Sequence, residues 1–142
     1  MSPIEETVGF VLAQVCKAHR NRTDATLKQI NLHVGQEMIL IRLWRTEGVT
    51  QSQLVEQLCV EPPTVTKMLQ RMEQEGLLQR RADPEDARVS RVFLTDQGRA
   101  LQKDVEAAWH SVDERTTAGL TFEERILLRR LLLQVRNNLT DS

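Results

Sequence analysis

The segment from Thr50 to Leu94 constrains the fold more than any other part of this chain. It has the pattern of a short helix, a tight turn, a second helix and two short strands around a charged loop. Thr50 and Gln53 have the spacing of a capping box, which satisfies two backbone donors at a helix start. The first helix then has a narrow apolar stripe, formed by Leu54, Val55 and Leu58. The segment therefore predicts a helix-turn-helix followed by a β-hairpin.

The second helix of this segment has the composition of a DNA-binding element. It opens at Pro62 and Pro63, where proline is tolerated because the first-turn N–H groups have no partner within the helix. Its apolar face follows spacings of three and four, at Val65, Met68, Leu69 and Met72. No acidic residue lies between Pro62 and Arg71. A helix that offers hydroxyls, an amide and two cations outward suits the major groove of DNA.

Two runs of the sequence carry a resemblance to a known family. PPTVTKMLQRMEQEGLLQR, followed by DPEDARVSRVFLTDQG, resembles the MarR family of winged helix-turn-helix transcription regulators. The similarity extends from Leu32 to about Leu101, with TQSQLVEQL as the first helix of the motif. Asp86-Ala87-Arg88 matches the D-x-R of the family's wing. The PTVT, EGL, D-x-R and LTxxG elements occur in the expected order and spacing.

The resemblance implies a mainly α fold with a small β-wing, assembled as an intertwined helical homodimer with two winged motifs. We expect one MarR-type domain over residues 1–142. Its expected parts are dimerisation helices at 1–33 and 97–142 and a winged helix-turn-helix at 34–95, with the helix-turn-helix at about 50–73 and the wing at about 77–94.

Hydrophobic periodicity places the remaining elements. The expected elements are helices over about 4–30, 34–46 and 97–117, a short strand at Val49, and wing strands over 77–81 and 89–94. The helix over 34–46 is apolar on most sides, which predicts burial between layers.

The last helix is expected to begin at a capping box formed by Thr121 and Glu124. Eight aliphatic residues follow in fourteen positions: Ile126, Leu127, Leu128, Leu131, Leu132, Leu133, Val135 and Leu139. That is more than one core-facing stripe needs, so part of this helix should pack against a second copy of the chain. A closed two-fold dimer is the commonest such arrangement.

Composition excludes several other classes of protein. The 142 residues include 19 basic and 20 acidic ones, which excludes a uniformly basic coat but still permits a local basic face. No run approaches the roughly 20 apolar residues of a membrane helix, and MSPIEETVGF lacks the basic start of a secretory signal. Neither a glycine-rich phosphate loop, a nucleophile elbow nor an H-E-x-x-H motif occurs. We expect a cytoplasmic, non-enzymatic binding protein without a cofactor.

The candidate DNA-binding residues lie on both helices of the motif and on the wing. Lys67 and Arg71 would reach guanine edges or phosphates, and Gln70 suits adenine. By the resemblance, Arg88 of D-x-R enters the minor groove, while Asp86 supports the wing by orienting an arginine. The candidate set is Thr50, Gln51, Pro63, Thr64, Thr66, Lys67, Gln70, Arg71, Arg88, Ser90 and Arg91. The expected partner is double-stranded DNA carrying an inverted repeat, and the expected role is repression.

The resemblance also implies a small aromatic or lipophilic effector, bound in a crevice between the dimerisation helices and the winged motif. The candidate pocket residues are His19, Arg20, His33, Met38, Ile41, Trp44 and Trp109. The three histidines, which include His110, do not form a metal-ligand cluster in the sequence, so no metal site is expected.

Two other functions stay open at this stage. Peroxide-sensing members of the family use a cysteine in the first helix, where Cys16 lies, but they surround it with tyrosines, and this chain has none. A cysteine on an apolar helix more often packs as a small hydrophobe, and Cys59 in the turn is expected to pack in the core. The other alternative is a winged-helix adaptor for protein partners. The basic, acid-free helix disfavours it, because protein-binding faces more often expose aromatic or aliphatic residues.

Overall fold

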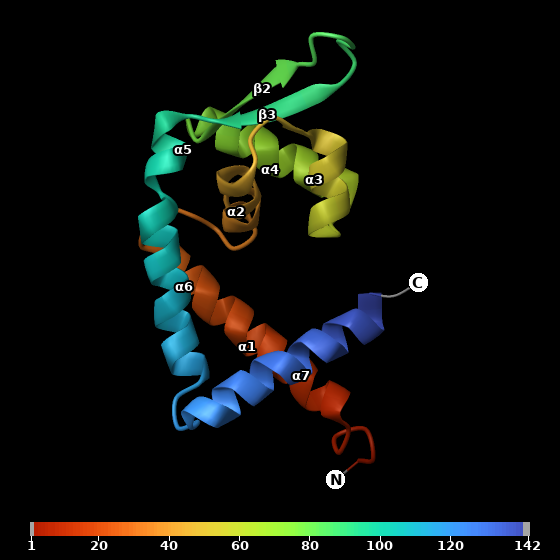
Figure 1. Cartoon of the computed structure of the whole chain (residues 1–142), viewed down its shortest axis with the longest axis vertical. Helices are drawn as coiled ribbons and strands as arrows, with labels where there is room; N and C mark the ends of the chain where they lie inside the picture. The colour runs from red at the N-terminus through yellow and green to blue at the C-terminus, as the bar shows by residue number, and fades with distance from the viewer. Residues whose placement is uncertain (1, 141–142) are drawn as a thin grey trace.

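The computed structural model describes residues 2–140 and divides into a head and three long helices (Figure 1). The elements are α1 (Val8–Lys28), α2 (Gln36–Arg45), β1 (Val49–Thr50), α3 (Gln51–Leu58), α4 (Pro62–Gln74), β2 (Leu78–Ala82), β3 (Ser90–Leu94), α5 (Asp96–Ala100), α6 (Gln102–Thr116) and α7 (Phe122–Thr140). The head comprises α2 to β3. The long helices are α1, α6 and α7, and α5 joins the head to α6.

The sheet of the head has the strand order β1-β3-β2, and both pairings are antiparallel. Val49 pairs with Val92 in β3, so the predicted short strand beside the wing is confirmed. On the other side of β3, Leu78 pairs with Leu94 and Ala82 pairs with Ser90. The β2–β3 hairpin is the wing, and its loop projects beyond the helices of the head (Figure 1).

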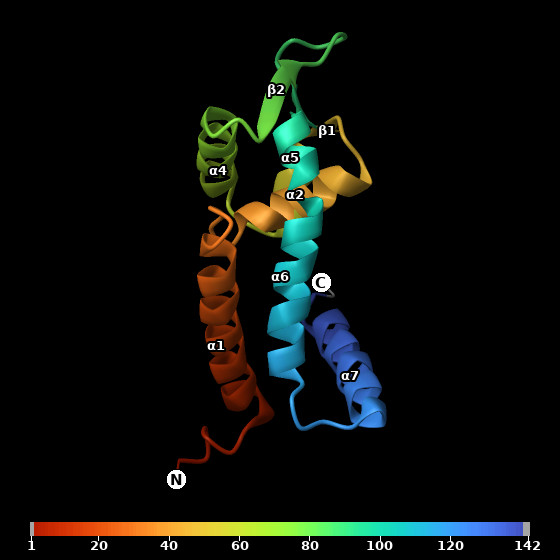
Figure 2. The same ribbon diagram turned by 90° about the vertical axis from the view of Figure 1, so that its left-hand side faces the viewer.

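Two helix boundaries differ from the sequence prediction. The first helix begins at Val8 and not near Ile4, because the Thr7 hydroxyl accepts a hydrogen bond from the Phe10 N–H and caps the helix there. The helix predicted over 97–117 is two consecutive helices, which meet at Leu101. These two helices continue in nearly the same direction (Figure 2) along one side of the molecule (Figure 1).

One hydrophobic core joins the head to α1 and α6. It includes Leu27 at the end of α1 and Val105 on α6, together with head residues such as Leu40, Leu54 and Leu69. Met38 departs from the predicted burial of the second helix, since it remains 42% exposed. The shared core means that the head and the upper parts of α1 and α6 pack as one unit.

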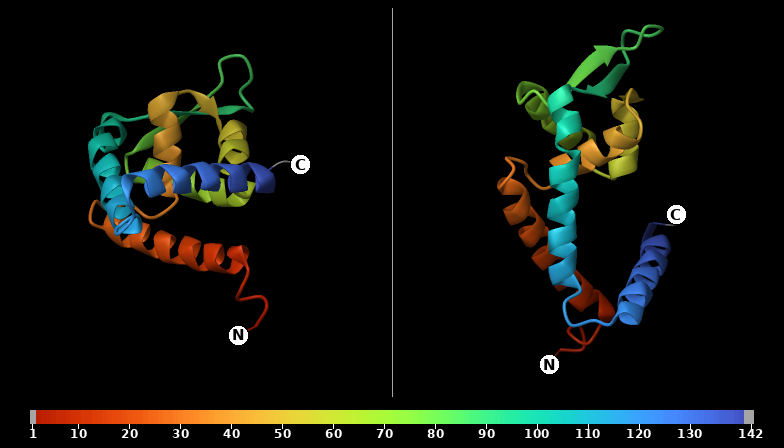
Figure 3. Two further views of the ribbon diagram at one scale, coloured as in Figure 1. Left: turned by 60° about the horizontal axis from the view of Figure 1, so that its bottom comes forward. Right: turned by 60° about the vertical axis from the view of Figure 1, so that its left-hand side comes forward.

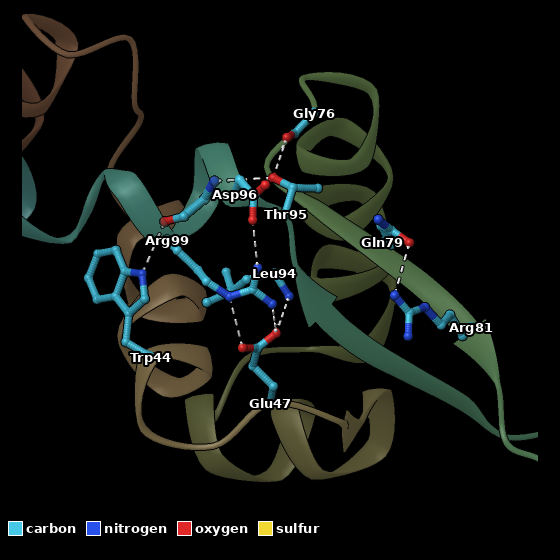
Figure 4. Close-up of polar contacts among 10 residues, drawn as sticks. Trp44, Glu47, Gly76, Gln79, Arg81, Leu94, Thr95, Asp96 and Arg99 are labelled. Atoms are coloured by element: carbon cyan, nitrogen blue, oxygen red, sulfur yellow. Dashed lines mark hydrogen bonds and ion pairs between the residues drawn. The ribbon is translucent and has the colours of Figure 1, made fainter.

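The corner between the head and α5 is closely packed. A Cβ atom on Gly98 would lie 2.1 Å from the carbonyl oxygen of Leu77, so only glycine fits there. The Trp44 Nε1–H donates to the Gly98 carbonyl at 3.0 Å. The Thr95 hydroxyl accepts from the Gly98 N–H at 3.1 Å and donates to the Gly76 carbonyl at 2.6 Å (Figure 4). These contacts explain the glycine of the LTxxG element.

An ion pair closes the same corner. The Arg99 guanidinium contacts Glu47 at 2.9 Å and Asp96 at 3.1 Å (Figure 4). Glu47 also accepts the Leu94 N–H at 2.9 Å. The Arg99 and Leu94 donors lower the pKa of Glu47, with Arg99 as the larger cause. The end of α2, strand β3 and helix α5 are thereby held together.

Helix α7 stands away from the rest of the chain. Figure 2 and the right-hand view of Figure 3 show it separated from α1, with α6 between them, and none of its described residues is buried. Its exposed apolar side chains are Phe122, Ile126, Leu127, Leu131, Leu132 and Leu139, and α1 exposes Val8, Val11 and Val15. The predicted excess of aliphatic residues on the last helix therefore corresponds to an uncovered apolar surface. Within residues 2–140, no helix has the length and hydropathy required to span a membrane.

A buried carboxyl group lies near the start of α2. Glu37 is 0% exposed, and its Oε1 accepts the Gly35 N–H at 2.6 Å. Within the described residues, two buried polar atoms have no hydrogen-bond partner: Glu37 Oε2 and Trp109 Nε1. Burial raises the pKa of Glu37, although the hydrogen bond from the Gly35 N–H opposes the shift.

We expect Glu37→Gln to remove a pH-dependent loss of stability. Because the folded-state pKa is raised, the folded chain holds this proton more tightly than the unfolded chain does. The stabilisation that the protonated Glu37 side chain gives the wild-type protein is therefore fully present below the unfolded-state pKa of about 4.5. It is lost as pH rises through the folded-state pKa. Thermal unfolding measured between pH 4.5 and 8 should show the difference shifting in favour of the variant as pH rises. A difference that stays constant with pH, or the same shift in the exposed control Glu56→Gln, would contradict this expectation.

Candidate nucleic-acid interface

Helix α4 presents the outward face that the sequence predicts. It buries Val65, Leu69 and Met72 against the rest of the head. Five of the candidate DNA-binding residues on it are exposed: Pro63, Thr64, Lys67, Gln70 and Arg71. The proline pair occupies the first two positions of the helix, where no backbone hydrogen bond is lost. Helix α4 thus offers a polar, cationic surface on a rigidly packed support.

Three other candidates make contacts within the motif. Thr50 forms the predicted capping box, in which its hydroxyl accepts from the Gln53 N–H at 3.1 Å. The Gln51 Nε2–H donates to Thr66 Oγ1 at 2.8 Å, and Thr66 Oγ1 donates to the Pro62 carbonyl at 3.0 Å. Gln51 and Thr66 therefore connect α3 to α4 and fix the angle of the helix pair.

Arg71 lies at the end of the exposed face and is tied to the α1–α2 connection. Its Nε is 3.2 Å from Glu75 Oε1, and its Nη2 is 2.9 Å from His33 Nε2. The Gln36 Nε2–H also donates to Glu75 Oε1, at 3.3 Å. The Arg71 side chain remains 60% exposed, so it is still accessible to a nucleic acid.

The wing carries one highly exposed arginine beside its predicted support. Arg88 Nε is 3.1 Å from Asp86 Oδ1, and the Arg88 side chain is 91% exposed. Asp86 Oδ1 also accepts the Arg88 N–H at 3.0 Å. The Arg88 side chain and N–H are the causes that lower the pKa of Asp86. Asp86 lies where the sequence places it, and it directs Arg88 outward from the loop.

Arg91 is placed differently from the other candidates. Its Nε contacts Asp83 Oδ2 at 2.5 Å, and its Nη1–H donates to the Gly48 carbonyl at 2.7 Å. The guanidinium is thus bound within the base of the wing, and its side chain is 38% exposed. The sequence does not indicate this, because Gly48 and Arg91 are 43 residues apart.

A groove separates the start of α3 from the wing. It has a volume of about 420 Å³ and is lined by Thr50, Gln51, Ser52, Val55, Pro62, Arg88, Val89 and Ser90. The exposed Ser52 hydroxyl and the Arg88 guanidinium are donors that suit phosphate oxygens. Ser90 therefore lies between the two candidate DNA-binding elements, and Ser52 is a lining residue that the candidate set omitted.

The predicted effector residues do not form a single pocket. A cavity of about 280 Å³ between α2 and α6 is lined by Ile41, Trp44, Arg45, Gln102, Val105, Glu106, Trp109 and His110. Only Ile41, Trp44 and Trp109 come from the predicted set. The His19 ring does not line this cavity, but its centroid is 5.7 Å from that of Trp109.

The other three predicted pocket residues lie elsewhere. Arg20 and Met38 are exposed outside the cavity, and His33 contacts Arg71. Arg45 and His110 line the cavity but were not among the predicted pocket residues. The helical spacing of Gln102, Val105, Glu106 and Trp109 was the available signal for a lining face on α6.

Neither cysteine is buried in the chain. Cys16 is exposed on α1, so the expectation that it packs as a small hydrophobe is wrong within the single chain. Cys59 is also exposed, and the prediction that it packs in the core is wrong. It ends α3 in a left-handed conformation (φ 54°), and its thiol lies 3.7 Å from the Glu56 carbonyl oxygen. In the part of the chain that the structure describes, no group of three His, Cys, Asp or Glu side chains could hold a metal ion.

The comparisons with known proteins agree with this geometry. The sequence model of the MarR family matches residues 32–90. The transcriptional regulator TtmR of Methylorubrum extorquens is 34% identical over 136 residues, which cover 96% of this chain and 69% of TtmR. The chain belongs to the MarR family of DNA-binding transcriptional regulators, which are not enzymes.

Two solved structures have the same fold. One is BpsR of Bordetella bronchiseptica, described with the regulation of its DNA binding by 6-hydroxynicotinic acid; the TM-score is 0.86 at 25% identity, with 96% of this chain and 98% of that chain covered. The other is a mutant of MarR from E. coli in complex with operator DNA; the TM-score is 0.85 at 23% identity, with 95% of this chain and 99% of that chain covered. The winged-helix fold predicted from the sequence is confirmed.

We expect Gln70→Ala to weaken binding to the best DNA site by about 1–3 kcal/mol and to relax base preference at one position of each half-site. The reason is that Gln70 is exposed in the middle of the α4 face, where an amide can bond an adenine edge. Gln74→Ala, one turn further along the same helix, is the matched control. The measurement is binding to a panel of single-base operator variants. Equal effects of the two substitutions would show that Gln70 does not read bases.

Proposed function

We propose that this protein is a homodimeric repressor that binds an inverted-repeat operator and is released by a small aromatic carboxylate. The observation that carries the proposal is the placement of the exposed α4 face and Arg88 of the wing in one head, above long helices whose apolar surfaces the chain leaves uncovered. A surface of this kind favours association of protomers.

The long helices support a two-fold dimer. Val8 on α1 is 80% exposed, and Phe122 and Ile126 on α7 are 69% and 56% exposed. Large apolar side chains are rarely left uncovered in such numbers on a monomeric protein. A closed two-fold contact covers the same patch on both copies. It also presents two heads in opposite orientations, which requires a DNA site with matching symmetry. The half-sites should be about one helical turn, roughly 34 Å, apart.

Selection of bound DNA from a random pool should therefore enrich an inverted repeat, and log affinity should fall steeply with log salt because several phosphates are neutralised.

Ile126→Glu should give a monomer that keeps its helical circular dichroism but binds the operator weakly. Asn138→Glu, on the same helix, should remain dimeric. Mass in solution is measured by light scattering. A selected pool without symmetry, or binding that is insensitive to salt, would favour the protein-binding adaptor.

The cavity between α2 and α6 supports an effector with an aromatic ring and an acidic group. Trp44, Trp109 and Ile41 supply apolar walls, while Arg45 and His110 supply cationic or hydrogen-bonding groups at the same cavity. The reported control of BpsR by 6-hydroxynicotinic acid is consistent with a compound of this class. Because the cavity joins a head helix to a long helix, a ligand there can favour one head spacing over another.

Salicylate-like compounds should change the fluorescence of Trp44 and Trp109 and lower operator affinity about 5- to 150-fold, a coupling of about 1–3 kcal/mol. The operator should weaken compound binding by the same factor. Arg45→Met should reduce compound binding more than Arg42→Met, since Arg42 does not line the cavity. If compounds bind without changing operator affinity, the effector proposal is wrong.

The alternative to such an effector is thiol-based peroxide sensing, for which the exposed Cys16 is the candidate residue. Release from DNA by mild hydroperoxide, abolished in Cys16→Ser, would support the thiol.

A further inference from the structure

The loop of the wing is organised around one carboxylate. Asp83 Oδ1 accepts the Glu85 N–H at 2.8 Å and the Asp86 N–H at 3.3 Å, while Asp83 Oδ2 contacts Arg91 Nε. The Asp83 N–H donates to the Val89 carbonyl at 2.8 Å and closes the loop. The Asp83 side chain is only 12% exposed, so its charge is directed into the loop and not toward solvent.

Arg91 connects this carboxylate to the body of the head. It lies on β3 opposite Thr50 of β1, at the start of α3. Its Nη1–H donates to the Gly48 carbonyl, and the Gly48 N–H donates to the Val92 carbonyl at 2.8 Å. Arg91 therefore connects the wing loop to Gly48, which immediately precedes β1 and is close in sequence to the start of α3.

These contacts form a continuous path to the exposed arginine of the wing. The path runs from Gly48 through Arg91 and Asp83 to the Asp86 N–H, and the Asp86 carboxylate then contacts Arg88. A loop without this path would have to be ordered when DNA binds, which opposes association. With the path intact, the Arg88 side chain starts from a fixed position across the groove from α3.

We propose that Asp83 and Arg91 are positioning residues, which fix the wing relative to α3 and so determine where Arg88 meets the DNA, and that Arg91 does not bind a phosphate itself. The inference rests on the proposed DNA-binding role of the wing. For loss of the Asp83 charge, this proposal and simple electrostatics predict opposite changes in DNA affinity. Removing a negative charge near DNA favours binding, whereas removing the positioning contact opposes it.

The decisive experiment compares Asp83→Asn with Glu85→Gln by measuring operator affinity at one salt concentration. Both changes remove one negative charge from the same loop, but the Glu85 contribution to the contacts described is its backbone N–H, which the substitution keeps. Asp83→Asn should weaken binding about tenfold, which is about 1.4 kcal/mol, and Glu85→Gln should leave binding unchanged or tighter. Tighter binding by both variants would overturn the proposal.

Substitutions of Arg91 distinguish a positioning role of its side chain from direct contact with a DNA phosphate. Arg91→Lys keeps the charge but cannot reproduce the paired contacts to Asp83 and Gly48, so it should weaken binding nearly as much as Arg91→Met. In an Arg88→Ala background, Arg91→Met should have little further effect, because positioning acts through Arg88. Retained affinity in Arg91→Lys, or additive losses in the double variant, would show that Arg91 contacts the phosphate directly.

Circular dichroism and mass in solution identify variants that fail to fold or dimerise. If Asp83→Asn does not fold, Asp83→Glu provides the second test: the longer carboxylate keeps the charge but displaces the contacts, and it should also weaken binding. Unchanged affinity of Asp83→Glu would overturn the proposal. Failure of the wild-type protein to bind any operator would instead contradict the proposed function, so the two failures are distinguishable.

Discussion

The close approach of α5 to the head at Gly98 is the constraint on which the arrangement of the molecule depends. The missing side chain lets the helix backbone reach the Leu77 carbonyl, and Trp44 and Thr95 then bond across the junction. The Glu47–Arg99 ion pair closes the same corner. Because α5 leads directly into α6, this corner sets the angle between the head and the long helices. It therefore also sets the spacing of the two heads in the proposed dimer.

Some charged side chains of the head form ion pairs within the motif, and others are exposed on the candidate nucleic-acid interface. Arg91 is neutralised by Asp83, and Arg80 by Glu73 on α4, so both stabilise the wing and its junction with α4. Lys67 and Arg88 remain directed outward. This division explains how a chain with a net charge of −1 presents a cationic surface. The carboxylates of Glu73, Asp83 and Asp86 are held in ion pairs with Arg80, Arg91 and Arg88.

Most of the fold was predictable because its elements have local signals. The Thr50–Gln53 capping box, the proline start of α4 and the alternation around β3 each act within a few residues. The boundary near Ile4 was wrong because the cap at Thr7 competes with apolar periodicity that continues further toward the N-terminus. The break at Leu101 was also missed, since the periodicity continues across it.

The sequence by itself determined the class of site, because the acid-free face of α4 and the D-x-R of the wing are short linear patterns. Only the tertiary structure decided which of these side chains are free. It assigned Gln51 and Thr66 to the contact between α3 and α4, and Arg91 to Gly48. It also separated His33 and Met38 from the cavity that Trp44 and Trp109 line. The physical reason is that helical spacing fixes which residues share a face, whereas hydrogen-bond partners and cavity walls depend on elements that are distant in the chain.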